Sequence, residues 1–221
     1  MAETGFRVAG VTKRYGSVTA LSDVSLTVSA GRLHGLVGPN GSGKTTLFHV
    51  LSGLARPTDG RVGSPDASVG VGFQTPRFYP DLTVRENLRV FRSFAADSPP
   101  ADWTETLLSE LRLDPAAHRL AADLSGGFRT KLDLALAMVK RPTFLLLDEP
   151  LADVDDHSRR RIVSFLSGYP GEDRCVVVST HTLEAFADAL DRVTVLVDGR
   201  IEFDGPSEDD ALAQYRAALE E

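Results

Sequence analysis

Cysteine is almost missing from this 221-residue chain, which carries one, Cys175. No internal disulfide can form, and the valines that follow Cys175 predict a small buried residue in a strand. No apolar run approaches the roughly 18 to 20 residues that cross a bilayer. Residues 1–5 have neither the basic region nor the apolar block of a signal peptide. We expect a cytoplasmic chain that makes no direct membrane insertion.

Basic residues are also in deficit. The chain has 24 Lys and Arg against 31 Asp and Glu, a formal net charge of −7. Proteins that track the phosphate backbone of nucleic acid carry a basic patch, and the densest cluster here, residues 159–161, is typical of the solvated face of a helix. We therefore expect no nucleic-acid partner. The hydrophobic content of 42% is ordinary and suffices for the core of an α/β domain.

A glycine-rich segment at residues 38–46, G-P-N-G-S-G-K-T-T, fits the phosphate-loop pattern G-x-x-x-x-G-K-[ST]. Glycines let such a loop wrap its backbone N–H groups around phosphate oxygens. Lys44 would face the β- and γ-phosphates and Thr45 would offer its hydroxyl to Mg²⁺, at the positive end of the following helix. The predicted nucleotide-binding residues of this loop are Gly38, Pro39, Asn40, Gly41, Ser42, Gly43, Lys44, Thr45 and Thr46.

Strand and helix patterns divide the chain into a core and an insertion. Almost wholly apolar runs after residue 143 are typical of strands buried on both faces of a parallel sheet, and helical spacing between them indicates a βαβ order. Helical patterns between residues 83 and 139 indicate a lobe inserted into that core. The expected strands are 6–11, 24–28, 33–37, 69–73, 144–147, 176–178 and 193–197. The expected helices follow Lys44 and cover 83–94, 103–111, 128–139, 156–166, 182–190 and 209–221.

Three further motifs follow the phosphate loop: L-S-G-G at 124–127, F-L-L-L-D-E-P at 144–150 and T-H at 180–181. In this order and spacing the chain resembles the ATP-binding cassette (ABC) ATPases over nearly its whole length. The resemblance implies an α/β P-loop NTPase fold with a mainly parallel sheet, an N-terminal antiparallel β subdomain and an inserted α-helical lobe. We expect a single domain over 1–221, with the core at 1–75 and 140–221 and the lobe at 76–139.

The resemblance implies ATP and Mg²⁺ as cofactors and gives single residues a role. Tyr15 matches the aromatic residue that stacks on adenine, and Gln74 matches the glutamine that contacts Mg²⁺ and links the core to the lobe. Asp148 ends an apolar strand, where its carboxylate can hold Mg²⁺. Glu149 is expected to act as general base on the attacking water, and His181 matches the histidine that contacts the γ-phosphate. Together with Lys44, these last two are the predicted catalytic residues.

The serine-glycine tip, which we define as Ser125, Gly126 and Gly127, opens a predicted helix, with Ser125 as N-cap. By resemblance it faces the ATP of a second, head-to-tail subunit, and Asp155 matches the aspartate that connects the two sites. The predicted partners are therefore a second copy or a homologous ABC ATPase subunit. Phe128 stands where the family usually has Gln, so we expect altered closure or rate rather than lost activity.

Three functions are compatible with these residues. The first is the ATPase subunit of an ABC transporter, bound to separate transmembrane permease subunits on the inner face of the cell membrane. The segments 77–80 and 82–88 would form the coupling surface, and the latter resembles exporters of the ABC-2 type. The second is a soluble ABC-type ATPase that drives assembly or remodelling. The third is an ATP-binding switch with slow turnover, which Glu149 and His181 disfavour.

Overall fold

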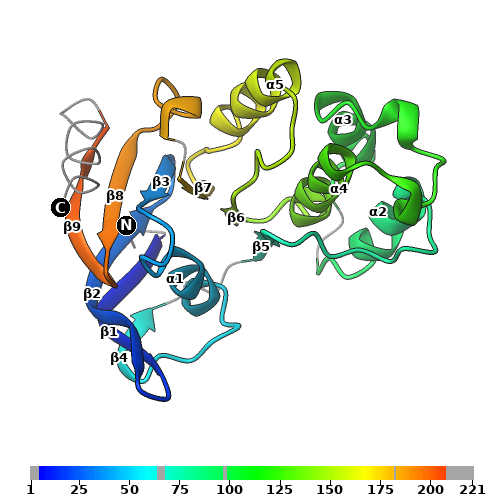
Figure 1. The fold of residues 1–221 in the computed structure, drawn as a ribbon. Helices are drawn as coiled ribbons and strands as arrows, with labels where there is room; N and C mark the ends of the chain where they lie inside the picture. Colours follow the sequence, from blue (N-terminus) through cyan, green and yellow to red (C-terminus); the bar gives the residue numbers. More distant parts are fainter. Residues whose placement is uncertain (1–4, 64–67, 97–98, 182, 208–221) are drawn as a thin grey trace.

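The centre of the protein is a six-stranded sheet with the order β5-β6-β7-β3-β8-β9 (Figure 1). The computed structural model describes residues 5–63, 68–96, 99–181 and 183–207. Neighbours from β5 to β8 are parallel, and β9 pairs with β8 antiparallel. The expected α/β fold with a mainly parallel sheet is confirmed. The strands are β3 (Leu33–Val37), β5 (Val69–Gly72), β6 (Phe144–Asp148), β7 (Cys175–Thr180), β8 (Arg192–Val197) and β9 (Arg200–Pro206).

A smaller antiparallel sheet of β2, β1 and β4 covers one face of the core. Its strands are β1 (Gly5–Tyr15), β2 (Val18–Ser29) and β4 (Asp59–Gly63), and the first two are longer than expected. Helix α1 (Lys44–Leu51) packs its buried side chains into a shared apolar cluster with β1, β2, β6 and β7. Phe6 and Phe144 join the two sheets there, with ring centroids 4.5 Å apart. This packing fixes α1, and hence the loop before it, against both sheets.

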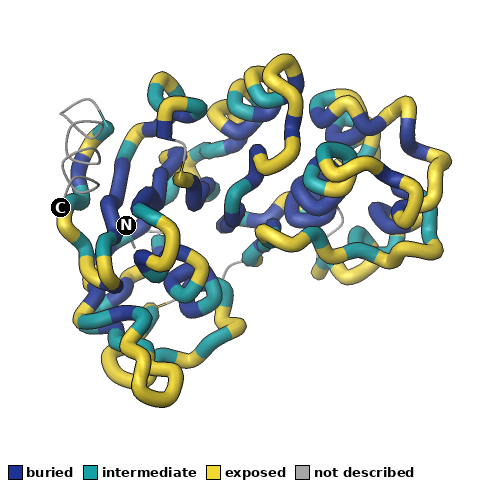
Figure 2. The backbone as a smooth tube through the Cα atoms, in the orientation of Figure 1, coloured by how far each residue is buried: buried dark blue, intermediate teal, exposed yellow. Residues whose placement is uncertain are grey.

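Three helices lie together beyond the β5 edge of the large sheet (Figure 1). They are α2 (Val84–Arg92), α3 (Trp103–Glu110) and α4 (Gly126–Met138), close to the expected ranges. Thr83 and Glu86 form a reciprocal capping box that starts α2 where the sequence predicts. Every residue of α4 from Lys131 onward is buried, so α4 is the central helix of this group (Figure 2). The boundaries of the lobe at 76 and 139 stay a prediction.

The helix expected over 182–190 is wrong for the residues that the structure describes there. A 3₁₀ turn at Leu183–Ala185 is followed by further tight turns. In this segment the chain must return along the sheet from the end of β7 to the start of β8. A 3₁₀ turn rises about 2 Å per residue against about 1.5 Å in an α-helix, so it covers the distance in fewer residues. It also buries both Leu183 and Phe186. The helix expected over 209–221 lies outside the described residues.

Two strands were not expected, β4 and β9, because both carry glycine and charged residues and are only partly buried. The last helix of the core, α5 (Asp156–Ser167), matches its expected range. Cys175 is fully buried in β7, and burial raises the pKa of its thiol to about 12. Among the described residues, none of the helices combines the length and apolar character that crossing a membrane requires.

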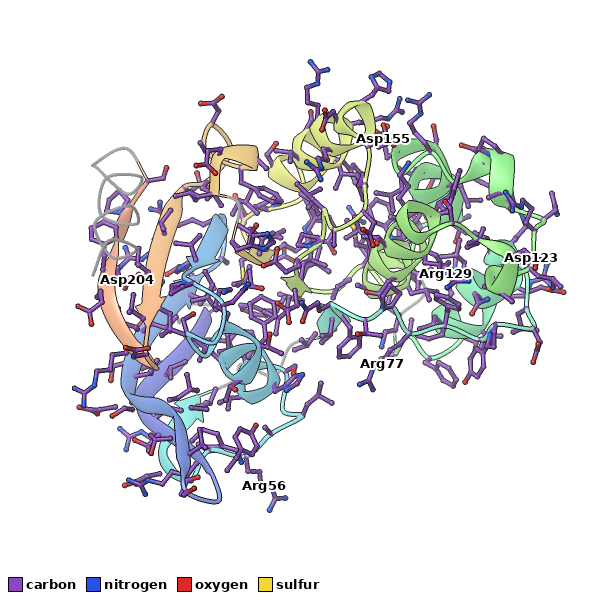
Figure 3. All side chains as sticks on the ribbon, viewed as in Figure 1. Arg56, Arg77, Asp123, Arg129, Asp155 and Asp204 are labelled. Carbon is purple, nitrogen blue, oxygen red and sulfur yellow. The ribbon has the colours of Figure 1, made fainter. Side chains whose placement is uncertain are left out.

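His34 is a buried polar residue in the middle of β3, 2% exposed. Its Nε2 lies 2.7 Å from the Thr194 hydroxyl, which in turn donates to Asp204 on β9 (Figure 3). Arg192 pairs with the same carboxylate at 2.6 Å. Because the Thr194 proton goes to Asp204, the Nε2–H of His34 donates to Thr194. Within the described part of the chain, the buried Nδ1 has no hydrogen-bond partner. Burial lowers the pKa of His34 to about 4.

This burial makes the fold sensitive to acid. The unfolded chain takes up a proton on His34 below about pH 6.5, whereas the folded protein resists protonation until about pH 4. The contribution of neutral, buried His34 to the free energy of unfolding is therefore fully present above pH 6.5. The free energy of unfolding falls by about 3 kcal/mol between pH 6.5 and 4. Urea unfolding at several pH values should show this loss, and His34→Gln should remove it relative to the wild type. Parallel pH curves for the two proteins would contradict the assignment.

Candidate nucleotide-binding site

The phosphate loop joins the carboxyl end of β3 to α1, at the edge where β6 and β7 also end. Gly41 and Gly43 have φ angles of 83° and 105°, a region that favours glycine. A Cβ at Gly43 would lie 2.6 Å from the backbone oxygen of Ala20 on β2. The loop therefore needs glycine at this point both for its turn and for its close approach to β2.

Lys44 opens α1 and is 7% exposed. Its Nζ donates to the carbonyl oxygens of Gly38 and Pro39 at 2.7 and 2.9 Å. Burial lowers the pKa of Lys44, and the nearby carboxylates of Glu149 and Asp148 act in the opposite direction. The hydroxyl of Ser42 is buried inside the same loop and has no hydrogen-bond partner among the residues that the structure describes. An enclosed ammonium and an unpartnered hydroxyl beside a helix N-terminus fit a bound phosphate group.

Oxygen groups suited to Mg²⁺ lie beside the loop. The Thr45 hydroxyl donates to Asp148 Oδ2 at 2.9 Å, and the Ser179 hydroxyl donates to Asp148 Oδ1. Asp148 ends β6 and Ser179 lies in β7, so the sheet itself places the carboxylate. Hard cations such as Mg²⁺ prefer oxygen ligands and combine few protein ligands with phosphate oxygens. No group of three or more His, Cys, Asp or Glu side chains suited to a metal occurs in the part of the chain that the structure describes.

Glu149 and His181 meet where β6 and β7 end. Glu149 has a φ of 51°, a left-handed conformation that is uncommon outside glycine and recurs at functional sites. Its N–H donates to the Ser179 carbonyl at 3.0 Å. Its Oε1 accepts the backbone N–H of His181 at 3.0 Å and lies 2.8 Å from Nδ1 of the His181 ring. The two predicted catalytic side chains are thus in direct contact.

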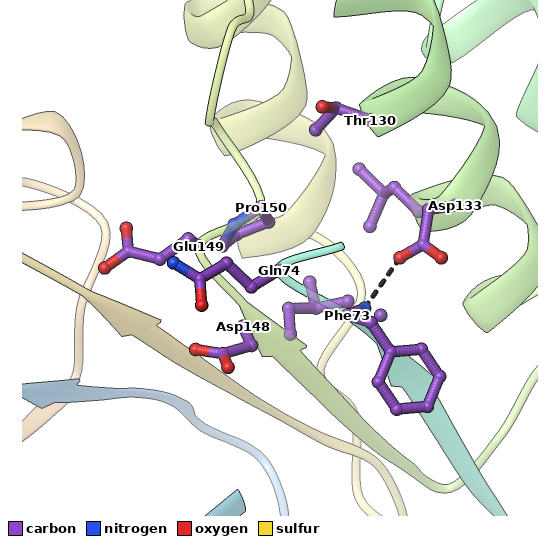
Figure 4. A pocket seen from close by; sticks show the side chains of 10 residues that line it. Phe73, Gln74, Thr130, Asp133, Asp148, Glu149 and Pro150 are labelled. Carbon is purple, nitrogen blue, oxygen red and sulfur yellow. Dashed lines mark hydrogen bonds between the residues drawn. The ribbon is translucent and has the colours of Figure 1, made fainter. Parts of the chain in front are cut away.

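An open cleft of about 290 Å³ is lined by half of the predicted site residues. Gln74, in the loop after β5, also lines it. A neighbouring cavity of about 10 Å³ separates Gln74 and Asp148 from Asp133 of α4 (Figure 4). The residues that line the open cleft are Ala20, Asn40, Gly41, Gly43, Lys44, Thr45, Thr46, Gln74, Asp148 and Glu149.

Other predicted residues do not line this cleft. Tyr15 ends β1 and is 48% exposed, with Lys13 Nζ 4.8 Å from its ring centroid. Ser125 occupies the N-cap position of α4, but its side chain makes no cap hydrogen bond. Ser125 and Gly126 are exposed, and Gly127 is partly exposed. The serine-glycine tip is therefore open to solvent and does not line the cleft that contains Lys44.

Asp155 caps α5 by accepting the Ser158 N–H at 2.9 Å (Figure 3). Hydrogen bonds from the side chain and the backbone of Ser158 lower the pKa of the Asp155 carboxyl to about 2. Lys131 of α4 donates to the Ser158 hydroxyl at 2.7 Å, lies 3.7 Å from the Asp155 carboxylate and sits over the Phe128 ring. Sequence reasoning missed this Lys131 contact, because a lysine within a helical pattern carries no signal of its partner.

Known proteins share the segment that contains the phosphate loop, Asp148 and Glu149. Residues 21–152 match the family model described as ABC transporter. This chain belongs to the ABC transporter family. The Nod factor export ATP-binding protein I of Rhizobium johnstonii is 34% identical over 206 residues, which cover 87% of this cassette and 66% of that protein. The sulfate/thiosulfate import ATP-binding protein CysA of Mesorhizobium japonicum is 38% identical, covering 92% and 64%. The cassette thus spans about two thirds of the length of these relatives.

Solved structures show the same fold. An ATP-binding subunit of an ABC transporter superposes with a TM-score of 0.85 at 24% identity, covering 98% of this cassette and 97% of that chain. A bacterial ABC transporter cassette solved as a dimer gives a TM-score of 0.82 at 24% identity, covering 91% and 98%. At this level of identity the likeness concerns the fold alone.

Proposed function

We propose that this cassette hydrolyses ATP to ADP and phosphate and powers an ABC exporter. The observation that carries the proposal is the contact between Glu149 and His181 at the edge of the cleft that also holds Lys44, Thr45 and Asp148. A water-activating carboxylate, a phosphate cradle and a cation site on one edge of a parallel sheet are the parts that phosphoryl transfer to water needs.

In this proposal each residue has one task. The loop N–H groups and Lys44 bind the phosphates, and Tyr15 stacks on the adenine. Thr45, Asp148 and Gln74 would hold Mg²⁺, which when bound neutralises charge that develops on the phosphate oxygens.

The chemical step falls to the pair at the strand ends. Glu149 orients the attacking water and takes its proton on the carboxylate. His181, held by Glu149, contacts the γ-phosphate and steadies the same water.

The exposure of the serine-glycine tip outside the cleft supports a head-to-tail dimer. Its backbone N–H groups begin a 13-residue helix and are open to an anion carried by a second subunit. A second copy, or a homologous subunit, would place its ATP there, and Asp155 would then lie at the interface between the two sites. ATP would close the pair, and hydrolysis would open it.

Separate transmembrane permease subunits would receive this motion, with the cassette cytoplasmic and peripheral on the inner face of the membrane. The segment after Gln74 supports a docking surface, because Tyr79 is a large side chain left 49% exposed beside α2. Several relatives at 33–36% identity are named as export ATP-binding proteins, which favours export, whereas one at 38% is named for import.

Photo-crosslinking tests the transporter assignment. A benzoylphenylalanine in place of Tyr79 should crosslink to a multi-span membrane protein in native membranes, and ATP should change the yield. Val18 provides a matched control, because it is 63% exposed and is the first residue of β2. Figure 1 shows β1 and β2 well apart from α2, α3 and α4. The same probe at Val18 should give no such product. Crosslinks from Tyr79 to soluble proteins only would favour an assembly or remodelling ATPase instead.

A further inference from the structure

Asp133 is a buried carboxylate that the mechanism above does not use. It lies on α4 and is 5% exposed. Its Oδ2 accepts the backbone N–H of Phe73 at 2.7 Å, and its Oδ1 accepts that of Arg77 at 2.9 Å. Figure 4 shows the carboxylate turned toward the loop that follows β5. One side chain thus holds the backbone on both sides of Gln74.

A carboxylate can make both bonds with a separate oxygen for each N–H. Asn would replace one of these oxygens with an NH2 group, which cannot accept an N–H, and Ala offers no acceptor. Burial raises the pKa of Asp133 to about 6, and the two backbone hydrogen bonds act in the opposite direction. The Arg77 guanidinium lies over the Phe73 ring, 4.7 Å from its centroid, which closes the loop over the carboxylate. The unfavourable burial of this carboxylate is therefore offset by the hydrogen bonds that hold the loop.

The helix that carries Asp133 also carries the serine-glycine tip at its N-terminus. Asp133 lies about two turns after Gly126, roughly 10 Å along the helix axis. Buried packing from Lys131 to Met138 holds α4 as one body. Because Asp133 grips the loop on both sides of Gln74, a displacement of α4 moves the tip and the loop together.

We propose that Asp133 is a positioning residue that fixes the Gln74 loop to α4, so that Gln74 takes its place in the nucleotide cleft in step with the serine-glycine tip. The inference rests on the proposed function, since it concerns when Gln74, a proposed Mg²⁺ ligand, enters the cleft. Asp133 itself acts through the loop backbone and touches neither nucleotide nor cation.

The test compares Asp133→Ala and Asp133→Asn with Leu136→Ala, a control that removes another buried side chain of α4. Amide-resolved NMR exchange should speed up about tenfold or more at Phe73 and Arg77 in Asp133→Ala, relative to β6 amides, because two N–H groups lose their acceptor. Asp133→Asn should free only one of them. Leu136→Ala should lower overall stability without a selective change at either amide.

Kinetics form the second arm. Per nucleotide-binding site, Asp133→Ala should lower kcat about tenfold with KM changed less than about twofold, because ATP is held by the phosphate loop. Asp133→Asn should be intermediate and Leu136→Ala unchanged. Unaltered exchange at the Phe73 and Arg77 amides of Asp133→Ala would overturn the inference. Faster exchange at these amides together with a wild-type kcat would also overturn it. A wild-type protein without ATP turnover would instead contradict the proposed function, and the exchange arm would then decide on Asp133 alone.

Discussion

Replacing Glu149 with Gln should lower kcat for ATP hydrolysis by about 10²- to 10⁴-fold, the contribution of a positioned general base, and leave ATP affinity nearly unchanged. Glu149 accepts the backbone N–H of His181 at 3.0 Å and is 14% exposed at its side chain. Gln has the same length and keeps an oxygen that can accept this N–H. The local geometry therefore survives, and only the ability to take a proton from water is lost.

Phosphate release and equilibrium binding of a fluorescent ATP analogue measure the two quantities separately. Asp156→Asn is the matched control, because it removes a nearby carboxylate whose side chain is 90% exposed, and it should keep the wild-type rate. With ATP present, the slow Glu149→Gln protein should also accumulate as a dimer in light scattering. A wild-type rate for Glu149→Gln would exclude Glu149 as the base. Negligible turnover in both proteins would favour the ATP-binding switch.

Local patterns were sufficient for the fold class and for the phosphate loop. The loop glycines, the lysine and the apolar strands each carry their signal within a few residues, so β3, α1 and β6 follow directly from the sequence. The positions of Asp148 and Glu149 also follow, since side chains at the carboxyl ends of parallel strands share one edge of the sheet. The structure brings them to one cleft with Lys44.

Contacts between distant segments were not predictable in this way. Asp133 and Phe73 are 60 residues apart, and nothing in the pattern of α4 distinguishes a buried aspartate from a solvated one. The same holds for the hydrogen bond between Lys131 and Ser158. It also holds for Asp153, whose backbone oxygen lies so close to Gly127 that a Cβ there would be 2.6 Å away. The turn that replaces the expected helix after His181 is also set by distance, because the chain must reach the start of β8. Local propensity does not encode such long-range constraints.

Gly127→Ala should reduce kcat by about 10²-fold, which is the cost of misplacing catalytic groups by about 1 Å. A Cβ at Gly127 would lie 2.6 Å from the backbone oxygen of Asp153, far inside normal contact. Asp153 already has a left-handed φ of 57°, so the segment has little freedom to withdraw. The strain must displace either the serine-glycine tip or the segment that leads to Asp155, and both are proposed to complete the second ATP site.

Gly126→Ala provides the matched comparison within the same tip, and we expect a smaller loss in kcat than for Gly127→Ala. The atoms nearest to its Cβ would be side-chain atoms of Asp153, with Oδ2 at 3.3 Å and Cβ at 3.4 Å, so this contact is looser than the 2.6 Å approach to backbone at Gly127. Both changes add an alanine to the first turn of α4, so any gain in helix propensity is shared. Steady-state ATPase assays at equal nucleotide occupancy compare the two proteins. Equal rates would show that the contact between Gly127 and Asp153 does not set the geometry of the catalytic dimer.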